Sequence, residues 1–300
     1  MSVAAREQVA SQGLLFRAGV SIRMVRRLAG RKPLGAVAAL LLLGLILMAI
    51  FANLIAPYDP LAQDPRSVLA APSRAHFMGT DNLGRDIWSR IIFGSRISLA
   101  AGIGAVGIGI FTGTVIGLTS GYAGRGYDLV IQRIMDAWLA FPGLIFILTI
   151  IAALGPGLPQ TILAIGIGRI PGSSRVLRSQ VLSLKERDYV LAARTLGAGN
   201  LRIVVRHILP NLMPTVIILS SISMAGAVLA EATLSFLGVG VPPPAPAWGS
   251  MLSGNARVYF LSAPWFAIWP GVFISLTVLS WNLGGDALRD ILDPRLRGSK

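Results

Sequence analysis

The chain has 300 residues, of which 54% are hydrophobic and only 13% charged, with a mean hydropathy of +0.69. In an ordinary soluble domain about a quarter of residues are charged, so this composition excludes that class and indicates a membrane protein. The net charge of +14 does not indicate nucleic acid as a partner, because the basic residues lie where membrane topology requires them, and the absence of cysteine excludes disulfides and thiolate chemistry.

The first predicted element is a membrane-spanning helix over residues 34–56. This stretch, LGAVAALLLLGLILMAIFANLIA, contains no charge and is long enough to cross a hydrocarbon core of about 30 Å. A signal peptide would have a shorter apolar region and a small-residue cleavage site. We therefore expect a retained membrane helix, preceded by a basic cytoplasmic N-terminus over residues 1–33.

Further apolar stretches predict a total of six membrane helices. The later spans are expected over residues 97–118, 137–154, 158–172, 213–238 and 265–283. The expected organisation is an external loop over residues 57–96, a five-helix core over 97–284, and a cytoplasmic C-terminal tail over 285–300. The expected fold class is therefore an all-α membrane protein.

The distribution of lysine and arginine predicts the orientation of these spans. Twenty basic residues fall in segments on one side of the membrane: 1–33, 119–136, 173–212 and 284–300. Six fall on the other side, in residues 57–96 and 239–264. The positive-inside rule therefore places both termini in the cytoplasm.

The second span contains GIGAVG, residues 102–107, which matches the dinucleotide-binding pattern. A dinucleotide site also needs a preceding strand and an acidic residue about 20 positions further on, and neither is found here. Small residues recur instead at every fourth position, which predicts a surface where another helix packs closely. They are Ala101, Ala105, Gly109, Gly113, Gly117 and Gly121.

Two charged residues fall inside predicted spans. Glu231 would be costly facing lipid, so it is expected to face protein or a water-filled path. The sequence leaves open whether it lines a translocation path or makes a contact between helices. Arg169 lies in a short span near a loop, and its long side chain is expected to reach the membrane surface.

The cytoplasmic loop over residues 173–212 is basic and contains YVLAARTLGAGNLRIVVRHILPN, which predicts two short helices. The first begins near Asp188, and four of its residues share one face at spacings of three and four: Tyr189, Ala192, Ala193 and Leu196. Gly197 ends it with a turn that favours positive φ. Asn200 is expected to cap the second helix, which ends at Pro210, a residue suited to the first turn of the next span.

Catalytic motifs are missing from the sequence. The only lysines are Lys32, Lys185 and Lys300, and none follows glycine, which excludes a Walker A phosphate loop. His76 and His207 are isolated in the sequence. We therefore expect no catalytic residue, bound cofactor or metal in this chain. A transporter subunit, a channel, a structural assembly factor and an intramembrane enzyme remain open on composition alone.

The cytoplasmic loop resembles the EAA loop of permease subunits in bacterial and archaeal ABC importers. That motif runs Glu-Ala-Ala, three residues, Gly, nine residues, Ile, one residue, Leu-Pro. The matching residues here are Ala192, Ala193, Gly197, Leu209 and Pro210. Leu191 and His207 stand where the motif has glutamate and isoleucine, so the spacing is intact although two positions depart from it.

Three more stretches resemble the dipeptide, oligopeptide and nickel branch of these permeases. They are GTDNLGRDIWSRIIFGSRISL at 79–99, AEATLSFLGVGVPPPAPAWGSML at 230–252 and GDALRDILDPRLRG at 285–298. One N-terminal span before a modest outer loop resembles the second, C-type permease of such pairs. The resemblance extends in order over residues 30–298.

The resemblance implies a type I ABC importer permease fold in a bacterial or archaeal cytoplasmic (inner) membrane. A second permease, expected to be a different chain, would complete the translocation pathway. Two ATP-binding subunits would use ATP and Mg, and an extracytoplasmic substrate-binding protein would deliver cargo. The residues expected to couple to the ATPases are Ala192, Ala193, Arg194, Leu196, Gly197, Leu209 and Pro210. Arg202 and Arg206 are either further contacts or only determine topology and touch anionic lipid.

The outer loop carries five arginines and the acidic residues Asp59, Asp64, Asp81 and Asp86. It would face the substrate-binding protein, or else be solvated and paired with itself. Peptides are the expected cargo, with nickel, glutathione, opines and short oligosaccharides open. The rival class is a stand-alone secondary transporter or channel, which should show ionisable residues along several spans or paired interrupted helices. Few such charges occur in this sequence.

Overall fold

The computed structural model describes residues 33–292, and within that range every regular element is helical and no strand occurs. The predicted all-α class is therefore confirmed for this part of the chain. The N-terminal segment predicted over residues 1–33 lies outside the described residues except for its last one. The end of the predicted C-terminal tail, residues 293–300, lies outside them as well.

The first predicted span is a helix with a break near its end. α2 (Pro33–Ile50) stops at Phe51, and a single turn, α3 (Ala52–Ile55), follows. The guanidinium of Arg96, from the next helix, donates a hydrogen bond of 2.6 Å to the carbonyl of Ala49. That bond gives a partner to a carbonyl near the end of α2, where helix geometry supplies few.

The second helix, α4 (Ile87–Ala123), begins ten residues before its predicted start and has 37 residues. Asp86 caps it, because its carboxylate accepts the backbone N–H of Ser89 at 2.8 Å. The external loop expected to reach residue 96 is therefore shorter than predicted. This first part of the helix contains two arginines, Arg90 and Arg96, which lower its hydropathy, so the apolar pattern did not predict it. Both side chains donate hydrogen bonds to backbone carbonyls.

The small residues of α4 pack against α7 (Leu158–Leu184), as their spacing predicts. All six are buried. A Cβ added to Gly117 would lie 2.6 Å from the carbonyl oxygen of Ser174, so no larger residue fits there. The hydroxyl of Ser173 also donates to the carbonyl of Gly109 at 2.8 Å. The predicted packing surface is confirmed.

The third predicted span, residues 137–154, is wrong as a single straight helix. α5 (Arg125–Leu139) and α6 (Gly143–Leu154) meet at an angle of 87°. Pro142 explains the break, because proline disfavours helical geometry in the residue before it, here Phe141. α6 alone has 12 residues, which at about 1.5 Å each is shorter than a hydrocarbon core.

The fourth predicted span is also longer than expected, since α7 continues past residue 172 to Leu184. Arg169 therefore lies near the middle of a 27-residue helix and not near a loop. The expectation that its side chain reaches the membrane surface is wrong. Its guanidinium crosses instead to α10 (Leu209–Phe236), where it lies against Gly226.

Short helical segments connect α7 to α10, and two more short ones and one long helix follow α10. These remaining segments are α8 (Asp188–Thr195), α9 (Asn200–Ile203), the π-helical turn η2 (Val204–Ile208), α11 (Trp248–Leu252), α12 (Asn255–Val258) and α13 (Trp265–Leu292). The coupling loop predicted over 173–212 thus has helix through most of its length. α13 also takes in residues assigned to the tail that was expected to begin at 285.

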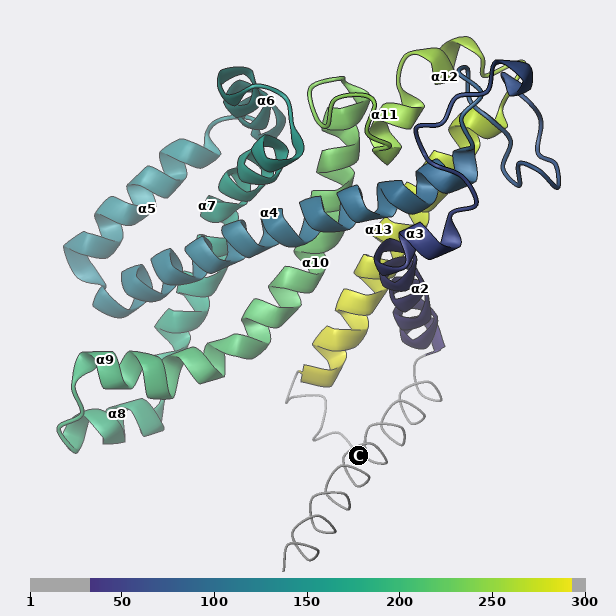
Figure 1. Cartoon of the computed structure of the whole chain (residues 1–300). Helices are drawn as coiled ribbons and strands as arrows, with labels where there is room; N and C mark the ends of the chain where they lie inside the picture. The colour runs from purple at the N-terminus through teal and green to yellow at the C-terminus, as the bar shows by residue number, and fades with distance from the viewer. Residues whose placement is uncertain (1–32, 293–300) are drawn as a thin grey trace, which may run out of the picture.

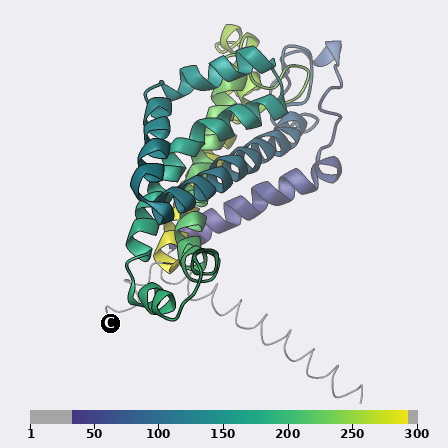
Figure 2. The ribbon, with the colours of Figure 1, turned by 90° about the vertical axis from the view of Figure 1, so that its left-hand side faces the viewer.

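The described helices form a bundle with two distinct ends. α8 and α9 lie together at one end, whereas the loop over residues 57–86 lies with α11 and α12 at the other (Figure 1, Figure 2). α4 runs obliquely between the two ends, with α7 and α10 packed along it. These three helices connect the two ends of the bundle.

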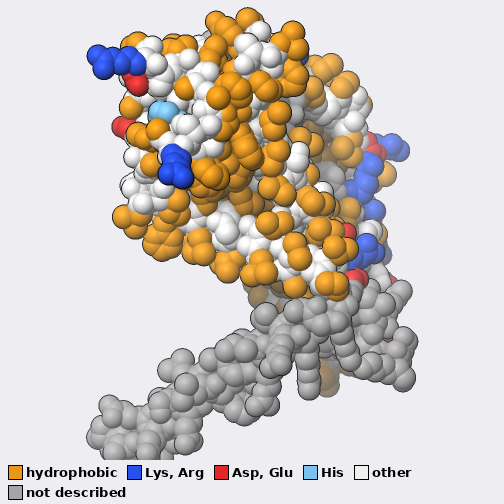
Figure 3. Space-filling view, turned by 90° about the vertical axis from the view of Figure 1, so that its right-hand side faces the viewer, with side chains coloured by type: hydrophobic (Ala, Val, Ile, Leu, Met, Phe, Trp, Pro, Cys, Tyr) orange, Lys and Arg blue, Asp and Glu red, His pale blue; other side chains and the backbone are white. Residues whose placement is uncertain are grey.

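Among the described helices, four are long and apolar enough to cross a membrane: α2, α4, α9 to α10 taken as one, and α13. The bent pair α5 and α6 would make a fifth. α7 is long enough but carries three arginines, at 169, 175 and 178, and is not among them. Hydrophobic side chains cover most of the face shown in Figure 3, with charged ones near its margins. Six spans therefore stay a prediction.

Candidate functional site

The helix α8 ends in a backbone motif that favours glycine. Gly197 has a φ of +79°, and its N–H donates to the carbonyl of Arg194 at 3.0 Å. The N–H of Ala198 donates to the carbonyl of Ala193 at 3.0 Å. These two bonds define a Schellman motif, in which a left-handed residue follows the helix. The positive φ predicted for Gly197 is confirmed.

One face of α8 is packed into the bundle. Val190 is fully buried, and Ala193 is 8% exposed. Val190 belongs to a hydrophobic cluster whose other buried members are Leu177, Val181, Leu184, Ile203, Ile208 and Leu212. These residues come from α7, α9, η2 and α10, so one cluster connects α8 to both long helices.

The predicted face of α8 is divided in the structure. The sequence pattern placed four residues together: Tyr189, Ala192, Ala193 and Leu196. Ala193 points inward, whereas Ala192 is exposed and Leu196 is 88% exposed. Val190 supplies the inward apolar contact in place of Leu196. The outer face consequently presents Ala192, Arg194 and Leu196.

The second predicted helix differs at both ends. Gly199 is the N-cap residue in place of Asn200, whose amide oxygen accepts the hydroxyl of Tyr122 at 2.8 Å. The helix does not stop at Pro210, because the backbone continues through η2 into α10. Leu209 and Pro210 form the first turn of α10, where proline is tolerated, as predicted.

Two polar contacts tie this region to the end of α4. The Tyr122 hydroxyl reaches Asn200 of α9, and the ammonium of Lys185 donates to the carbonyl of Gly121 at 3.2 Å. Sequence reasoning missed both contacts, because their partners are far apart in the chain. The region around α8 is thus attached to α4 as well as to α7 and α10.

Sequence reasoning also missed an ion pair near this end of the bundle. The Nε of Arg178 in α7 donates to a carboxylate oxygen of Asp128 in α5 at 2.6 Å, and a second guanidinium nitrogen binds the other oxygen. The hydroxyl of Ser120 in α4 donates to the same carboxylate. Three helices are joined at one point, and no local spacing reveals a pair separated by 50 residues.

Glu231 is fully buried between α4 and α10. One carboxylate oxygen accepts the hydroxyl of Ser98 at 3.2 Å, and the other accepts that of Ser235 at 2.8 Å. Ser235 in turn accepts the backbone N–H of Val241 in the following loop at 3.3 Å. One carboxylate oxygen therefore joins α10 to α4, and the other is bonded within α10.

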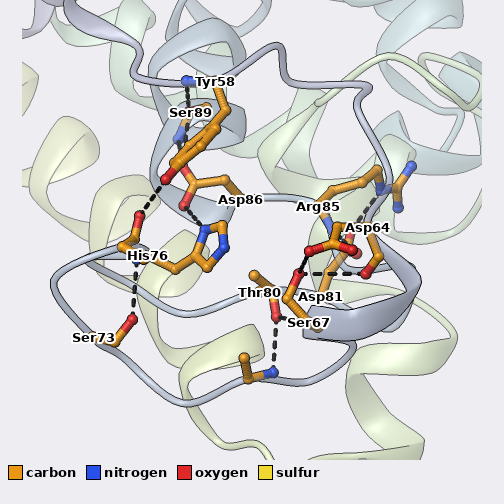
Figure 4. Close-up of polar contacts among 12 residues, drawn as sticks. Tyr58, Asp64, Ser67, Ser73, His76, Thr80, Asp81, Arg85, Asp86 and Ser89 are labelled. Carbon is orange, nitrogen blue, oxygen red and sulfur yellow. Dashed lines mark hydrogen bonds and ion pairs between the residues drawn. The ribbon is translucent and has the colours of Figure 1, made fainter.

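The start of α4 is held by a polar network in the outer loop (Figure 4). Asp86 accepts the backbone N–H and hydroxyl of Ser89, and its other oxygen lies 3.0 Å from Nδ1 of His76. The backbone N–H of Tyr58 donates to Ser89, and the Tyr58 hydroxyl donates to the carbonyl of Ala75. His76, isolated in the sequence, is thus part of a network that anchors the loop.

The other acidic residues of the outer loop are also bonded within it. Asp81 is fully buried and accepts Nε of Arg85 at 2.6 Å. Asp64 caps the 3₁₀ turn η1 (Pro65–Ser67), and the backbone N–H of Arg66 lowers the pKa of Asp64 below its ordinary value. Asp59 accepts the backbone N–H of Leu61. The four aspartates therefore stabilise the loop itself.

A cavity of about 330 Å³ lies beside Asp81 at this end. Arg85, Arg90, Ser250 and Phe266 are among the residues that line it. Within residues 33–292, no three His, Asp or Glu side chains lie close enough together to hold a metal ion.

Comparison with known proteins identifies the family. Residues 113–298, more than half of the chain, match the family model described as the binding-protein-dependent transport system inner membrane component. The chain belongs to this family. Residues 22–72 of the permease also match the model for the N-terminal transmembrane domain of oligopeptide transport permease C. The resemblance to a C-type permease of the oligopeptide branch is confirmed.

Curated relatives resemble this permease over nearly their full length. The dipeptide transport system permease protein DppC of Alkalihalophilus pseudofirmus is 42% identical over 267 residues, which cover 89% of this chain and 88% of DppC. The glutathione transport system permease protein GsiD of Pectobacterium atrosepticum is 42% identical over 268 residues, 89% of each chain. The permease is therefore a membrane component of a binding-protein-dependent ABC importer.

A solved structure supports the same fold. An inward-facing structure of the MetNI methionine ABC transporter aligns with a TM-score of 0.56 at 19% identity, covering 68% of this chain and 96% of that chain. At that identity the likeness shows the fold alone. The predicted type I ABC permease fold is confirmed at this level.

Proposed function

We propose that this permease forms half of the translocation pathway of an ATP-driven importer and couples to two ATP-binding subunits through α8. The observation that carries the proposal is the difference between the two faces of α8, one packed into the bundle and the other exposed. Val190 packs in a hydrophobic cluster shared with α7 and α10 and Ala193 is buried as well, while Leu196 extends outward with 88% of its surface exposed. A helix anchored on one face and exposed on the other suits contact with a protein partner.

The outer face of α8 fits a cleft on an ATP-binding subunit. Ala192 and Gly197 lack bulk, so the helix approaches the partner closely, and Arg194 makes charge-assisted hydrogen bonds to acidic partner groups. Arg202 and Arg206 are exposed as well and either extend this contact or touch anionic lipid. In this proposal the partner subunits bind and hydrolyse ATP with Mg.

Movement of the ATP-binding subunits then reaches the membrane helices through packed contacts. A shift of α8 moves α7 and α10 through the shared hydrophobic cluster, and α4 through Tyr122 and Lys185. Packed helices of this kind have discrete arrangements and do not deform continuously. Coupled in this way, the bundle alternates between inward-open and outward-open states.

There are two other partners. One is a second permease, which is a different chain, and the other is an extracytoplasmic substrate-binding protein. The second permease completes the translocation pathway. The binding protein docks at the end of the bundle formed by the loop over residues 57–86, α11 and α12 (Figure 1). The apolar outer surface contacts lipid of a bacterial or archaeal cytoplasmic (inner) membrane. Both termini lie in the cytoplasm. The membrane is crossed six times: by α2, by α4, by the bent pair α5 and α6, by α7, by α10 and by α13.

Peptides are the proposed cargo. The relatives at 42% identity are named for dipeptide and glutathione transport, and glutathione is itself a small peptide. Nickel, opines and short oligosaccharides are the alternative cargoes for the same importer class. A stand-alone transporter or channel is disfavoured, because the family is one of binding-protein-dependent systems.

Reconstitution in liposomes tests this function. The permease is combined with the ATP-binding subunits, second permease and binding protein encoded beside it, and uptake of a radiolabelled dipeptide is measured. We expect ATP hydrolysis only when the ATP-binding subunits are present, and uptake only with the complete set. Hydrolysis or uptake by the permease alone would contradict the proposal.

A matched pair of variants tests whether α8 is the contact with the ATP-binding subunits. Leu196→Glu places a charge on the proposed contact and should release the ATP-binding subunits during purification. Leu261→Glu alters a leucine that is 96% exposed in the segment between α12 and α13, and should retain them. Equal retention of the ATP-binding subunits by both variants would exclude α8 as the coupling contact.

A further inference from the structure

The side chain of Arg169 crosses from the middle of α7 to the middle of α10. Its Cβ packs on Gly109 of α4, 2.8 Å from where a Cβ of that glycine would lie. Its Nη2 lies 2.7 Å from the position of a Cβ on Gly226, and Cζ lies at 3.7 Å. A glycine at each contact leaves room for the side chain. The guanidinium is therefore fixed far from both ends of α10.

Arg169 lacks a partner among the described residues. Its buried Nε makes no hydrogen bond there, and no carboxylate of residues 33–292 forms an ion pair with the guanidinium. Glu231, the buried carboxylate of α10, is bonded instead to two serine hydroxyls. A guanidinium offers five N–H donors and is always charged, so leaving it unpaired at this depth is costly.

The guanidinium lies beside an exposed part of α10. Gly226 is exposed, and so are Ile222 and Leu229, four residues before it and three residues after it on the same helix face. If lipid covered this face, the charge would contact hydrocarbon. A charged residue inside a membrane protein more often faces a pathway or a partner of opposite charge. The position calls for an anionic group that reaches the face of α10 from outside this chain.

We propose that Arg169 binds a carboxylate of the cargo as it passes through the membrane. The proposal rests on the function proposed above. Dipeptides and glutathione, the molecules named for the relatives, both end in an α-carboxyl group, which is ionised at neutral pH. Arginine recognises a carboxylate through two parallel N–H bonds, which gives orientation as well as attraction. Arg169 is thus a specificity-determining residue for cargo that carries a carboxylate.

The test compares two cargoes in the reconstituted complete transporter. One is a radiolabelled dipeptide with a free C-terminus, and the other is the same dipeptide as its C-terminal amide. Because the binding protein is identical in every sample, its own preference cancels when the uptake ratio of a variant is divided by that of the wild type. A lost charge-assisted bond lowers the ratio about tenfold or more in Arg169→Gln. Arg169→Lys keeps the charge, so its uptake ratio should lie between those of the wild type and Arg169→Gln.

Two further variants guard the interpretation. Gly226→Ala keeps Arg169 in the sequence, but its methyl group would lie 2.7 Å from Nη2, so the guanidinium has to shift and the same ratio should fall even if Arg169→Gln fails to assemble. Arg175→Gln removes an exposed arginine of the same helix, paired with Asp136, and should leave the ratio unchanged.

Several results would overturn the proposal. Equal loss of uptake for both cargoes, or an unchanged ratio in both Arg169→Gln and Gly226→Ala, would exclude carboxylate recognition. Loss of the second permease from the Arg169→Lys and Arg169→Gln complexes would show that Arg169 pairs with a carboxylate of that protein. Failure of the wild-type complex to take up either cargo with ATP would refute the proposed function itself.

Discussion

Two glycines follow α8 in the proposed coupling region, Gly197 and Gly199, and their backbone φ angles have opposite signs. Gly197 has a φ of +79°, whereas Gly199 has a φ of −65°, which any residue adopts. A Cβ at either position would have no atom within 4 Å. Only the backbone conformation therefore distinguishes the two positions within this chain.

We predict that Gly197→Val uncouples transport from ATP hydrolysis or releases the ATP-binding subunits. A non-glycine residue in the left-handed region costs about 1–2 kcal/mol, and a β-branched one is less tolerated still. The end of α8 would shift while every membrane helix stays intact. Uptake and co-purification of the ATP-binding subunits are measured at matched membrane levels.

The control for this prediction is Gly199→Val, which adds the same side chain two residues away without strain. It should retain most of the uptake. Normal transport by Gly197→Val, or equal loss in both variants, would show that the left-handed turn after α8 has no special role.

Residue-level prediction succeeded where the cause is local. The positive φ of Gly197 follows from its place after an apolar helical face, and Pro210 fits the first turn of α10 for a similar reason. One partner of Glu231, Ser98, could not be found in this way, because it lies 133 positions away. The sequence marks a buried carboxylate as expensive but does not say which hydroxyl satisfies it.

At the scale of elements, the contact of α4 with α7 is the best-predicted feature. Spacing of small residues at every fourth position defines one face of α4, and that face is buried against α7. Element bounds were predicted less well. Asp86 extends α4 by its cap, and Pro142 divides a continuous apolar stretch into α5 and α6. Hydropathy is averaged over many residues and does not register a single capping residue or a single proline. It therefore predicts neither the start of α4 nor the break between α5 and α6.

We predict that Gly117→Leu prevents normal packing of α4 on α7. The new Cβ would lie 2.6 Å from the carbonyl oxygen of Ser174 and 2.9 Å from the backbone nitrogen of Arg178, and backbone atoms cannot move aside cheaply. Overpacking of this kind costs typically about 1–3 kcal/mol. The expected result is a lower unfolding temperature in detergent and less protein in the membrane.

Gly107→Leu is the matched control on the same helix. Gly107 is exposed, and a Cβ there would meet nothing within 4 Å. Leucine also has a higher helix propensity than glycine, so this variant should be as stable as the wild type or slightly more so. If Gly117→Leu matched it in unfolding temperature, close approach of α4 and α7 would not be needed for stability.

At the scale of the whole molecule, the remaining question is how often the chain crosses the membrane. The apolar helices alone give four spans or five. A backbone bond argues for six, because the N–H of Gly157, between α6 and α7, donates to the carbonyl of Gly240 in the loop after α10 at 3.0 Å. The connection between α6 and α7 therefore lies at the same end as that loop, away from α8.

We predict that reporter fusions at Gly124 and Gly199 report the cytoplasm, and those at Gly155 and Ser253 the outside. Gly155 decides between the topologies, because a chain crossing only at α2, α4, α10 and α13 would leave the whole stretch from Gly124 to Gly199 in the cytoplasm. The 87° bend after α5 and the arginines of α7 weaken the hydropathy signal, yet both segments must cross if Gly157 meets Gly240. A cytoplasmic signal at Gly155 would make α5 and α6 a re-entrant loop, and an outside signal at Gly199 would remove α8 from reach of any ATP-binding subunit.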